Sequence, residues 1–210
     1  MVSKRVRIVL FALASVAGFG PLAAPSYAQI LDNPTFDADI LGWYPLGISQ
    51  IEWSSLDFAA SPDSGSARVT NLTVGAGDAT GSTQCVTDPV PEESYWLRAR
   101  VWMPGGQNES GGASLIYQIY SGTNCGTGYL TSGFSGEVAS ADSDIWRCVG
   151  LRFDSPAGTQ SMRIRLSVRK TEAGGSLAAN FDDLLLVPAL FLDDFECGNT
   201  YLWTVTQTPI

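Results

Sequence analysis

Two tryptophans and two arginines, placed between Ser94 and Met103, are the side chains best suited to recognising a ligand. They share one parity of this segment, so in an extended strand they lie on one face: Trp96, Arg98, Arg100 and Trp102. Indole rings stack on flat groups, and guanidinium groups donate directed hydrogen bonds. A face that is only solvated would carry threonine, serine, lysine or glutamate. The pattern therefore predicts a binding surface; the alternative is that loops cover Trp96 and Trp102.

The opposite parity of the same segment is apolar and predicts a buried row: Tyr95, Leu97, Ala99, Val101 and Met103. Two more segments repeat the pattern, with inward rows Met162, Ile164, Leu166, Val168 and Val149, Leu151, Phe153. Their outward partners are basic: Arg163, Arg165, Arg169 and Arg152. Either these arginines blunt sheet edges and cover apolar surface with their stems, or some of them join Arg98 and Arg100 on one sheet to meet an anionic or hydroxyl-rich ligand.

Short strands separated by Gly, Ser, Pro and Asn clusters fill the rest of the chain. We expect them at Ser66–Leu72, Gly81–Val86, Ser94–Met103, Ala113–Tyr120, Tyr129–Val138, Ile145–Phe153, Met162–Lys170 and Leu177–Val187, with weaker alternation over Ile48–Phe58. No segment keeps a helical period over three turns. The sequence thus predicts an all-β fold, a single-domain antiparallel β-sandwich of the jelly-roll kind.

Residues 1–28 have the features of a signal peptide: basic residues, an apolar run and the small-x-small site Ser26-Tyr27-Ala28. We expect export, a β-sandwich domain over residues 29–188, and a tail over residues 189–210. No later run is long enough to span a membrane. Removing Lys4, Arg5 and Arg7 leaves nine of the 12 basic residues against 21 acidic ones, a formal charge of −12. Nucleic acid is therefore not an expected partner.

The absence of histidine from the sequence excludes Ser-His and Cys-His catalysis and histidine-bearing zinc sites. Adjacent acids such as Asp182-Asp183 and Glu92-Glu93 point to opposite faces of a strand, so neither pair forms a facing acid and base. We expect no enzyme activity. Four cysteines without a C-x-x-C spacing, in an exported chain, indicate disulfides.

Four segments in order resemble the signature segments of jelly-roll carbohydrate-binding modules of families four and nine, which are galactose-binding-like β-sandwiches. They are Asn33-Pro34-Thr35-Phe36-Asp37 with Trp43, Ser64-Gly65-Ser66-Ala67-Arg68-Val69, Tyr95-Trp96-Leu97-Arg98-Ala99-Arg100-Val101, and Asn180-Phe181-Asp182-Asp183-Leu184. The resemblance spans about residues 31–187. It implies a secreted module that binds a polysaccharide or cell-surface glycan without catalysis. The alternative is a structural or adhesive envelope protein that binds a protein partner.

The resemblance also implies a structural Ca²⁺ between the first and last strands. By position, its ligands would be the carboxylates of Asp37 and Asp182 and the carbonyls of Thr35 and Ser66. Asp37 stands where the family often has glutamate, one methylene longer. The alternative is that both aspartates only cap turns.

Cys85 and Cys125 are placed like a cysteine pair seen in many relatives, and the resemblance implies a disulfide between them. Closing that 40-residue loop would stabilise the fold by about 4 kcal/mol in the chain-entropy model. Cys148 and Cys197 either pair with each other or leave Cys148 free.

A polysaccharide ligand would span several rings between Trp96 and Trp102, which lie roughly 20 Å apart in an extended strand. Gln118 and Tyr120 could extend this surface, although Tyr117 on the other parity has an equal claim to face outward. The tail Asp-x-Phe-Glu-x-Gly followed by Trp resembles a recurrent C-terminal segment of exported bacterial proteins. It is interpreted as a retention or sorting segment, or as the remnant of another module.

Overall fold

A computed structural model describes residues 29–189, and within them the chain is all-β. The strands are β1 (Tyr44–Leu46), β2 (Ser49–Ser54), β3 (Ser66–Asn71), β4 (Ala79–Thr87), β5 (Ser94–Trp102), β6 (Gly111–Tyr120), β7 (Tyr129–Phe134), β8 (Val138–Ala139), β9 (Trp146–Asp154), β10 (Ser161–Lys170) and β11 (Leu177–Pro188), with one 3₁₀ turn (Ser140–Asp142). No helix among these residues has the length and apolar character needed to cross a membrane. The predicted signal peptide and the tail beyond residue 189 lie outside the described residues.

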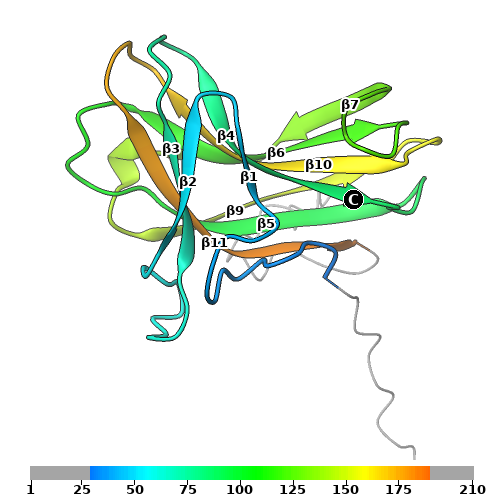
Figure 1. The fold of residues 1–210 in the computed structure, drawn as a ribbon, viewed down its shortest axis with the longest axis horizontal. Coiled ribbons are helices and arrows are strands. Elements are labelled where there is room, and N and C mark those ends of the chain that lie inside the picture. Colours follow the sequence, from blue (N-terminus) through cyan, green and yellow to red (C-terminus); the bar gives the residue numbers. More distant parts are fainter. Residues whose placement is uncertain (1–28, 190–210) are drawn as a thin grey trace, which may run out of the picture.

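The strands form two antiparallel sheets that pack face to face, as Figure 1 shows. The sheet that we call the β10 sheet has the order β1-β4-β10-β6-β7, with β8 also paired to β6. The other, the β5 sheet, has the order β2-β3-β11-β5-β9. The predicted antiparallel β-sandwich is confirmed.

The core between the sheets includes the predicted inward rows. Tyr95, Leu97, Ala99, Val101 and Met103 are at most 1% exposed, and the row from Met162 to Val168 is fully buried. The rings of Tyr117, Phe153 and Tyr95 stack across the interior, with 4.0 Å between the first two centroids and 5.7 Å between the last two. Tyr117 therefore points inward, and its neighbours Gln118 and Tyr120 lie on the outward parity of β6.

The two strands that carry paired arginines belong to different sheets. β5 lies between β11 and β9, whereas β10 lies between β4 and β6. Arg98 and Arg100 consequently lie on one outer face of the sandwich, and Arg163 and Arg165 lie on the opposite one. Of the arginines considered as partners of Arg98 and Arg100 on one sheet, Arg152 does lie there, opposite Trp96 on β9. The other three lie on β10 in the opposite sheet, because parity within a strand fixes a face but not which strands become neighbours.

The disulfide between Cys85 and Cys125 is present, with a Cα–Cα distance of 5.9 Å. It ties β4 to the loop between β6 and β7. Cys148 is not a free cysteine, so that alternative is wrong, and Cys197 lies outside the described residues.

Candidate functional site

The outer face of the β10 sheet carries a row of side chains that crosses five strands. Strand register places five residues in line, from β1 to β7: Tyr44, Thr83, Arg165, Ile116 and Phe134. Residues directly opposite one another in antiparallel strands share a face. With about 4.8 Å between strands, the row is roughly 19 Å long. Tyr44 is 66% exposed and Phe134 is 77% exposed, so each end of the row presents an open aromatic ring.

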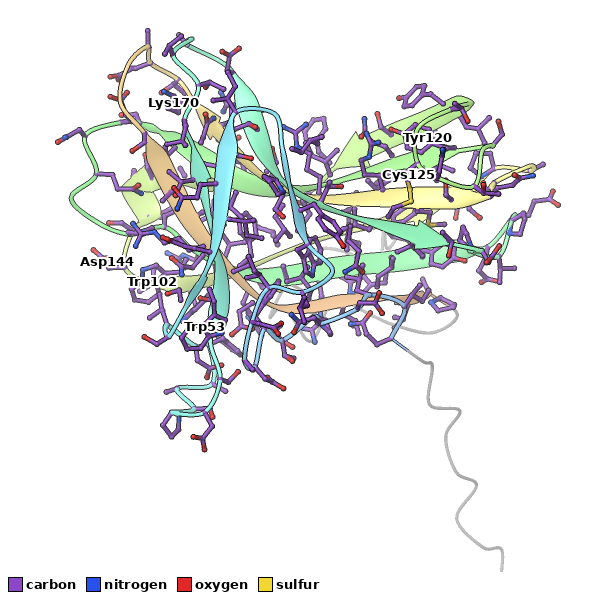
Figure 2. The ribbon with its side chains drawn as sticks, in the orientation of Figure 1. Trp53, Trp102, Tyr120, Cys125, Asp144 and Lys170 are labelled. Atoms are coloured by element: carbon purple, nitrogen blue, oxygen red, sulfur yellow. A yellow bond between two sulfur atoms is a disulfide. The ribbon has the colours of Figure 1, made fainter. Side chains whose placement is uncertain are left out.

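A second row lies next to the first, nearer the disulfide: Cys85, Arg163, Gln118 and Ser132. The Arg163 guanidinium lies 5.3 Å from the centroid of the Tyr120 ring and donates a hydrogen bond to the Cys125 carbonyl. The Tyr120 hydroxyl donates to Gln118 Oε1 over 3.3 Å. Figure 2 shows Tyr120 and Cys125 toward the same end of the sheet. We call this face, with both rows and Tyr120, the platform. The Tyr120 ring is only 6% exposed, so, like Trp96, it offers little surface to a ligand.

Arg165 lies in the middle of the platform with part of its hydrogen-bonding capacity unused. Its Nη2 donates to the Ala79 carbonyl, whereas its Nε is buried and has no partner. Burial lowers the pKa of Arg165, and the charge of Arg163 lowers it further. The site therefore holds a cation in a place where positive charge is disfavoured and one donor is unsatisfied.

The outer face of the β5 sheet holds the predicted quartet, and its side chains are largely enclosed by neighbours. Trp96 is 8% exposed and packs in a cluster with Val187 and Ala189. At the other end of β5, the ring centroids of Trp102 and Trp146 lie 5.7 Å apart. The structure brings the four residues onto one face, but Trp96 offers little surface to a ligand.

Both arginines of the quartet have a carboxylate partner. Asp183 Oδ2 lies 3.0 Å from Arg98 Nη1 and 3.9 Å from Arg100 Nε. The Arg100 guanidinium also lies 4.4 Å from the centroid of the Phe58 ring. A bulge in β11 directs Asp183 toward them: the register with β5 shifts between Asp182 and Leu185, and Asp183 has φ of 47°.

The predicted ligand residues therefore divide between two faces. Trp96, Arg98, Arg100 and Trp102 lie on the β5 sheet, whereas Gln118 and Tyr120 belong to the platform. The sequence reasoning did not single out Tyr44 and Phe134. A signal for Tyr44 was present: it directly follows Trp43, which is 3% exposed, so alternation would have placed it outward.

Three of the four predicted calcium ligands line one cavity of about 390 Å³: Thr35, Asp37 and Asp182. Asp57 and Asp183 also line it. The fourth predicted ligand, Ser66, is fully buried and does not line the cavity; its Oγ accepts a hydrogen bond from Asn180 over 2.9 Å. The predicted ligand atoms in this cavity are all oxygens, the ligand type that Ca²⁺ prefers.

Asp182 is the most buried acid of this cavity, at 3% exposure. Burial raises its pKa to about 6; backbone hydrogen bonds from Phe58 and Asp183 oppose this rise, and the charges of Asp57 and Asp183 add to it. Within residues 29–189, no three acidic or cysteine side chains lie close enough together to form a metal cluster by themselves. Any ion here would therefore need carbonyl or water oxygens besides the carboxylates.

The N-terminal segment is fixed beside β11, which explains how Thr35 and Asp37 reach Asp182. The Leu184 amide donates to the Pro34 carbonyl over 3.0 Å, and Trp53 Nε1 donates to the Phe36 carbonyl over 2.8 Å. Asp37 Oδ1 accepts a hydrogen bond from Ser64 Oγ over 3.0 Å.

Comparisons with known proteins give structural likeness only. No family model matches the sequence, and no curated protein matches it. An arabinose-bound α-L-arabinofuranosidase superimposes with a TM-score of 0.59 at 18% identity, over 77% of this chain and 26% of that protein. The chain thus spans about a quarter of that enzyme's length.

Two smaller structures are covered over nearly their whole length. The CBM22-1 xylan-binding domain of Paenibacillus barcinonensis Xyn10C superimposes with a TM-score of 0.54 at 14% identity, over 79% of this chain and 97% of the domain. Another CBM22 xylan-binding domain gives a TM-score of 0.54 at 16% identity, over 79% and 99%. These likenesses establish the sandwich fold that the chain shares with them.

Proposed function

We propose that this chain is a non-catalytic carbohydrate-binding module whose ligand lies across the platform. The observation that carries the proposal is the row between Tyr44 and Phe134, with an exposed ring at each end and Thr83, Arg165 and Ile116 between them. A sugar ring has an apolar face that stacks on an aromatic side chain, and hydroxyl groups that take hydrogen bonds from arginine and glutamine. The fold shared with xylan-binding domains supports this function.

The make-up of the platform also supports binding without catalysis. Glycoside cleavage requires two carboxyl groups on either side of the scissile bond. The two rows of the platform contain neither aspartate nor glutamate. Glu137, near the edge of the sheet, is held by Arg169 at 2.8 Å. The platform can therefore hold a sugar chain but offers no acid and base to cut it.

The test is retention of the full chain on insoluble polysaccharides, together with affinity electrophoresis in gels that contain soluble ones. The Y44A/F134A double variant should bind at least about tenfold more weakly, because each stacked ring contributes on the order of 1 kcal/mol or more. V74A/V90A is the matched control, since both valines are exposed loop residues outside the platform. Equal binding by Y44A/F134A and the wild type would remove the platform as the site.

Export is part of the same proposal. The Cys85–Cys125 disulfide fits an oxidising compartment, where such modules meet their ligands. N-terminal sequencing of protein recovered from the medium or cell surface should start near Gln29. Recovery with residues 1–28 intact would contradict the proposed signal peptide.

We also propose a structural Ca²⁺ held by Asp37, Asp182 and the Thr35 carbonyl. An ion there would neutralise the buried Asp182 carboxylate and join the N-terminal segment to β11. At a hundredfold excess over its Kd, Ca²⁺ should raise the melting temperature by about 5–10 °C relative to EDTA. D182N should abolish this rise, whereas D63N, in the nearby β2–β3 loop, should keep it. Identical melting in EDTA and in calcium would count against the ion.

A further inference from the structure

The arginines of this acidic chain differ in whether a carboxylate holds them. Five arginines have an Asp or Glu oxygen within 4.0 Å: Arg68, Arg98, Arg100, Arg147 and Arg169. Among the described residues, three arginines have no such partner, although acidic residues outnumber basic ones by 21 to 12 in the whole sequence. Arg152 lies on the β5 sheet and donates to Ser94 Oγ, whereas Arg163 and Arg165 lie together on the platform. The platform therefore concentrates positive charge that the protein itself does not neutralise.

The residues paired with these two arginines on the neighbouring strands include no acid. They lie two positions apart on the same face of β10, about 7 Å along the strand. Their outward neighbours on β4 and β6 are neutral: Thr83, Cys85, Ile116 and Gln118. The guanidinium groups are held by backbone carbonyls instead, Cys125 for Arg163 and Ala79 for Arg165.

This arrangement is costly for Arg165 in the absence of a ligand. Its Nε is buried without an acceptor, and a buried donor that makes no hydrogen bond loses its hydration without compensation. Burial and the neighbouring Arg163 charge both lower its pKa, so both disfavour its cationic form. An anion bound beside the two guanidinium groups would offset the repulsion between their charges.

We propose that the platform binds acidic glycans, with a carboxylate or sulfate group of the sugar chain held by Arg165 and Arg163; this rests on the platform being the glycan site. The planar guanidinium matches the two oxygens of a uronate carboxylate or of a sulfate ester. Tyr44 and Phe134 lie in the same row as Arg165. A sugar ring stacked on either aromatic side chain would therefore keep the polysaccharide aligned over the Arg165 guanidinium.

The experiment compares charged polymers with their uncharged counterparts. Affinity electrophoresis and calorimetry of the full chain would use polygalacturonate against its fully methyl-esterified form, and dextran sulfate against dextran. We expect tighter binding to at least one charged member than to its neutral partner. Preference for polygalacturonate would identify uronates, and preference for dextran sulfate would identify sulfate esters. The net negative charge of the protein opposes both, so unspecific attraction does not explain such a preference.

Variants then assign the preference to the platform. R165Q should weaken binding of the preferred charged polymer about tenfold, the loss expected for one hydrogen bond to a charged group, and weaken binding of the neutral partner by a smaller factor, the loss of one neutral hydrogen bond. R68Q is the matched control: it removes the same charge from the opposite face, where Arg68 pairs with Glu52 at the surface. If R165Q folds poorly, binding of the charged polymer is measured with R163Q instead.

The outcomes separate the two proposals. Equal binding of charged and neutral polymers, weakened by Y44A/F134A but not by R165Q, would overturn the acidic preference and keep the glycan site. A charged preference that R165Q and R68Q weaken equally would overturn the assignment to Arg165. Binding to no polysaccharide at all would overturn the proposed function, and with it this inference.

Discussion

The two outer faces of the sandwich carry similar side chains that differ in exposure and in ion pairing. Each has two arginines two positions apart on an inner strand, with aromatic rings nearby. On the β5 sheet, Asp183 lies 3.0 Å from Arg98, and Trp96 is 8% exposed. On the β10 sheet, Arg165 has no carboxylate partner and Phe134 is 77% exposed. Similar residue types thus stabilise the fold on one face and remain available to a ligand on the other.

The difference arises from what lies beside each strand. β5 has β11 as a neighbour, and the β11 bulge presents Asp183 to the arginines. β10 has β4 and β6 as neighbours, whose outward residues near Arg163 and Arg165 are uncharged. On these two strands, an acid on the adjacent strand decides whether the guanidinium groups form an ion pair. The comparison makes three predictions about stability.

The largest expected effect is on Trp96. W96A should destabilise the fold by about 3 kcal/mol, because it empties the volume that packs against Val187 and Ala189. The melting temperature should fall by roughly 6–12 °C in calorimetry. A W96A protein that melts like the wild type but no longer binds polysaccharide would indicate that the ligand binds on the β5 sheet.

A smaller loss is expected from D183N, which removes the charge that Arg98 and Arg100 share. We expect about 2 kcal/mol, less than for a fully buried pair, because the Asp183 side chain is 35% exposed. Chemical denaturation measures this change. D142N is the control, since Asp142 and Arg147 form a pair that is more than half exposed, and such pairs contribute little. Equal effects of the two variants would show that Asp183 has no special role.

The smallest effect on stability is expected on the platform. Y44A/F134A should change the free energy of unfolding by less than about 1 kcal/mol, because both rings are mostly exposed. The same variant should lose affinity for polysaccharide while its melting temperature stays nearly unchanged. A large fall in melting temperature would mean that these rings pack against the fold and would weaken their assignment to a ligand.

The sequence predicted most of the fold because alternation is a local property. Tyr95, Leu97 and Val101 are buried as their parity requires, and the observed bounds of β5 and β10 differ from the expected ones by one residue. The Cys85–Cys125 pair followed from resemblance and is confirmed. Gln118 could not be oriented from sequence, because Tyr117 competed for the outward side until its stacking on Phe153 was visible.

The sequence by itself determined which residues of each strand share a face, because the side chains of an extended chain alternate with period two. It also determined the acidic balance, the absence of histidine, and that Arg163 and Arg165 lie together. Only the tertiary structure decided that Asp183 meets Arg98 and that the row of Arg165 ends in Tyr44 and Phe134. Those neighbours come from distant parts of the chain, and the packing of the whole sandwich selects them.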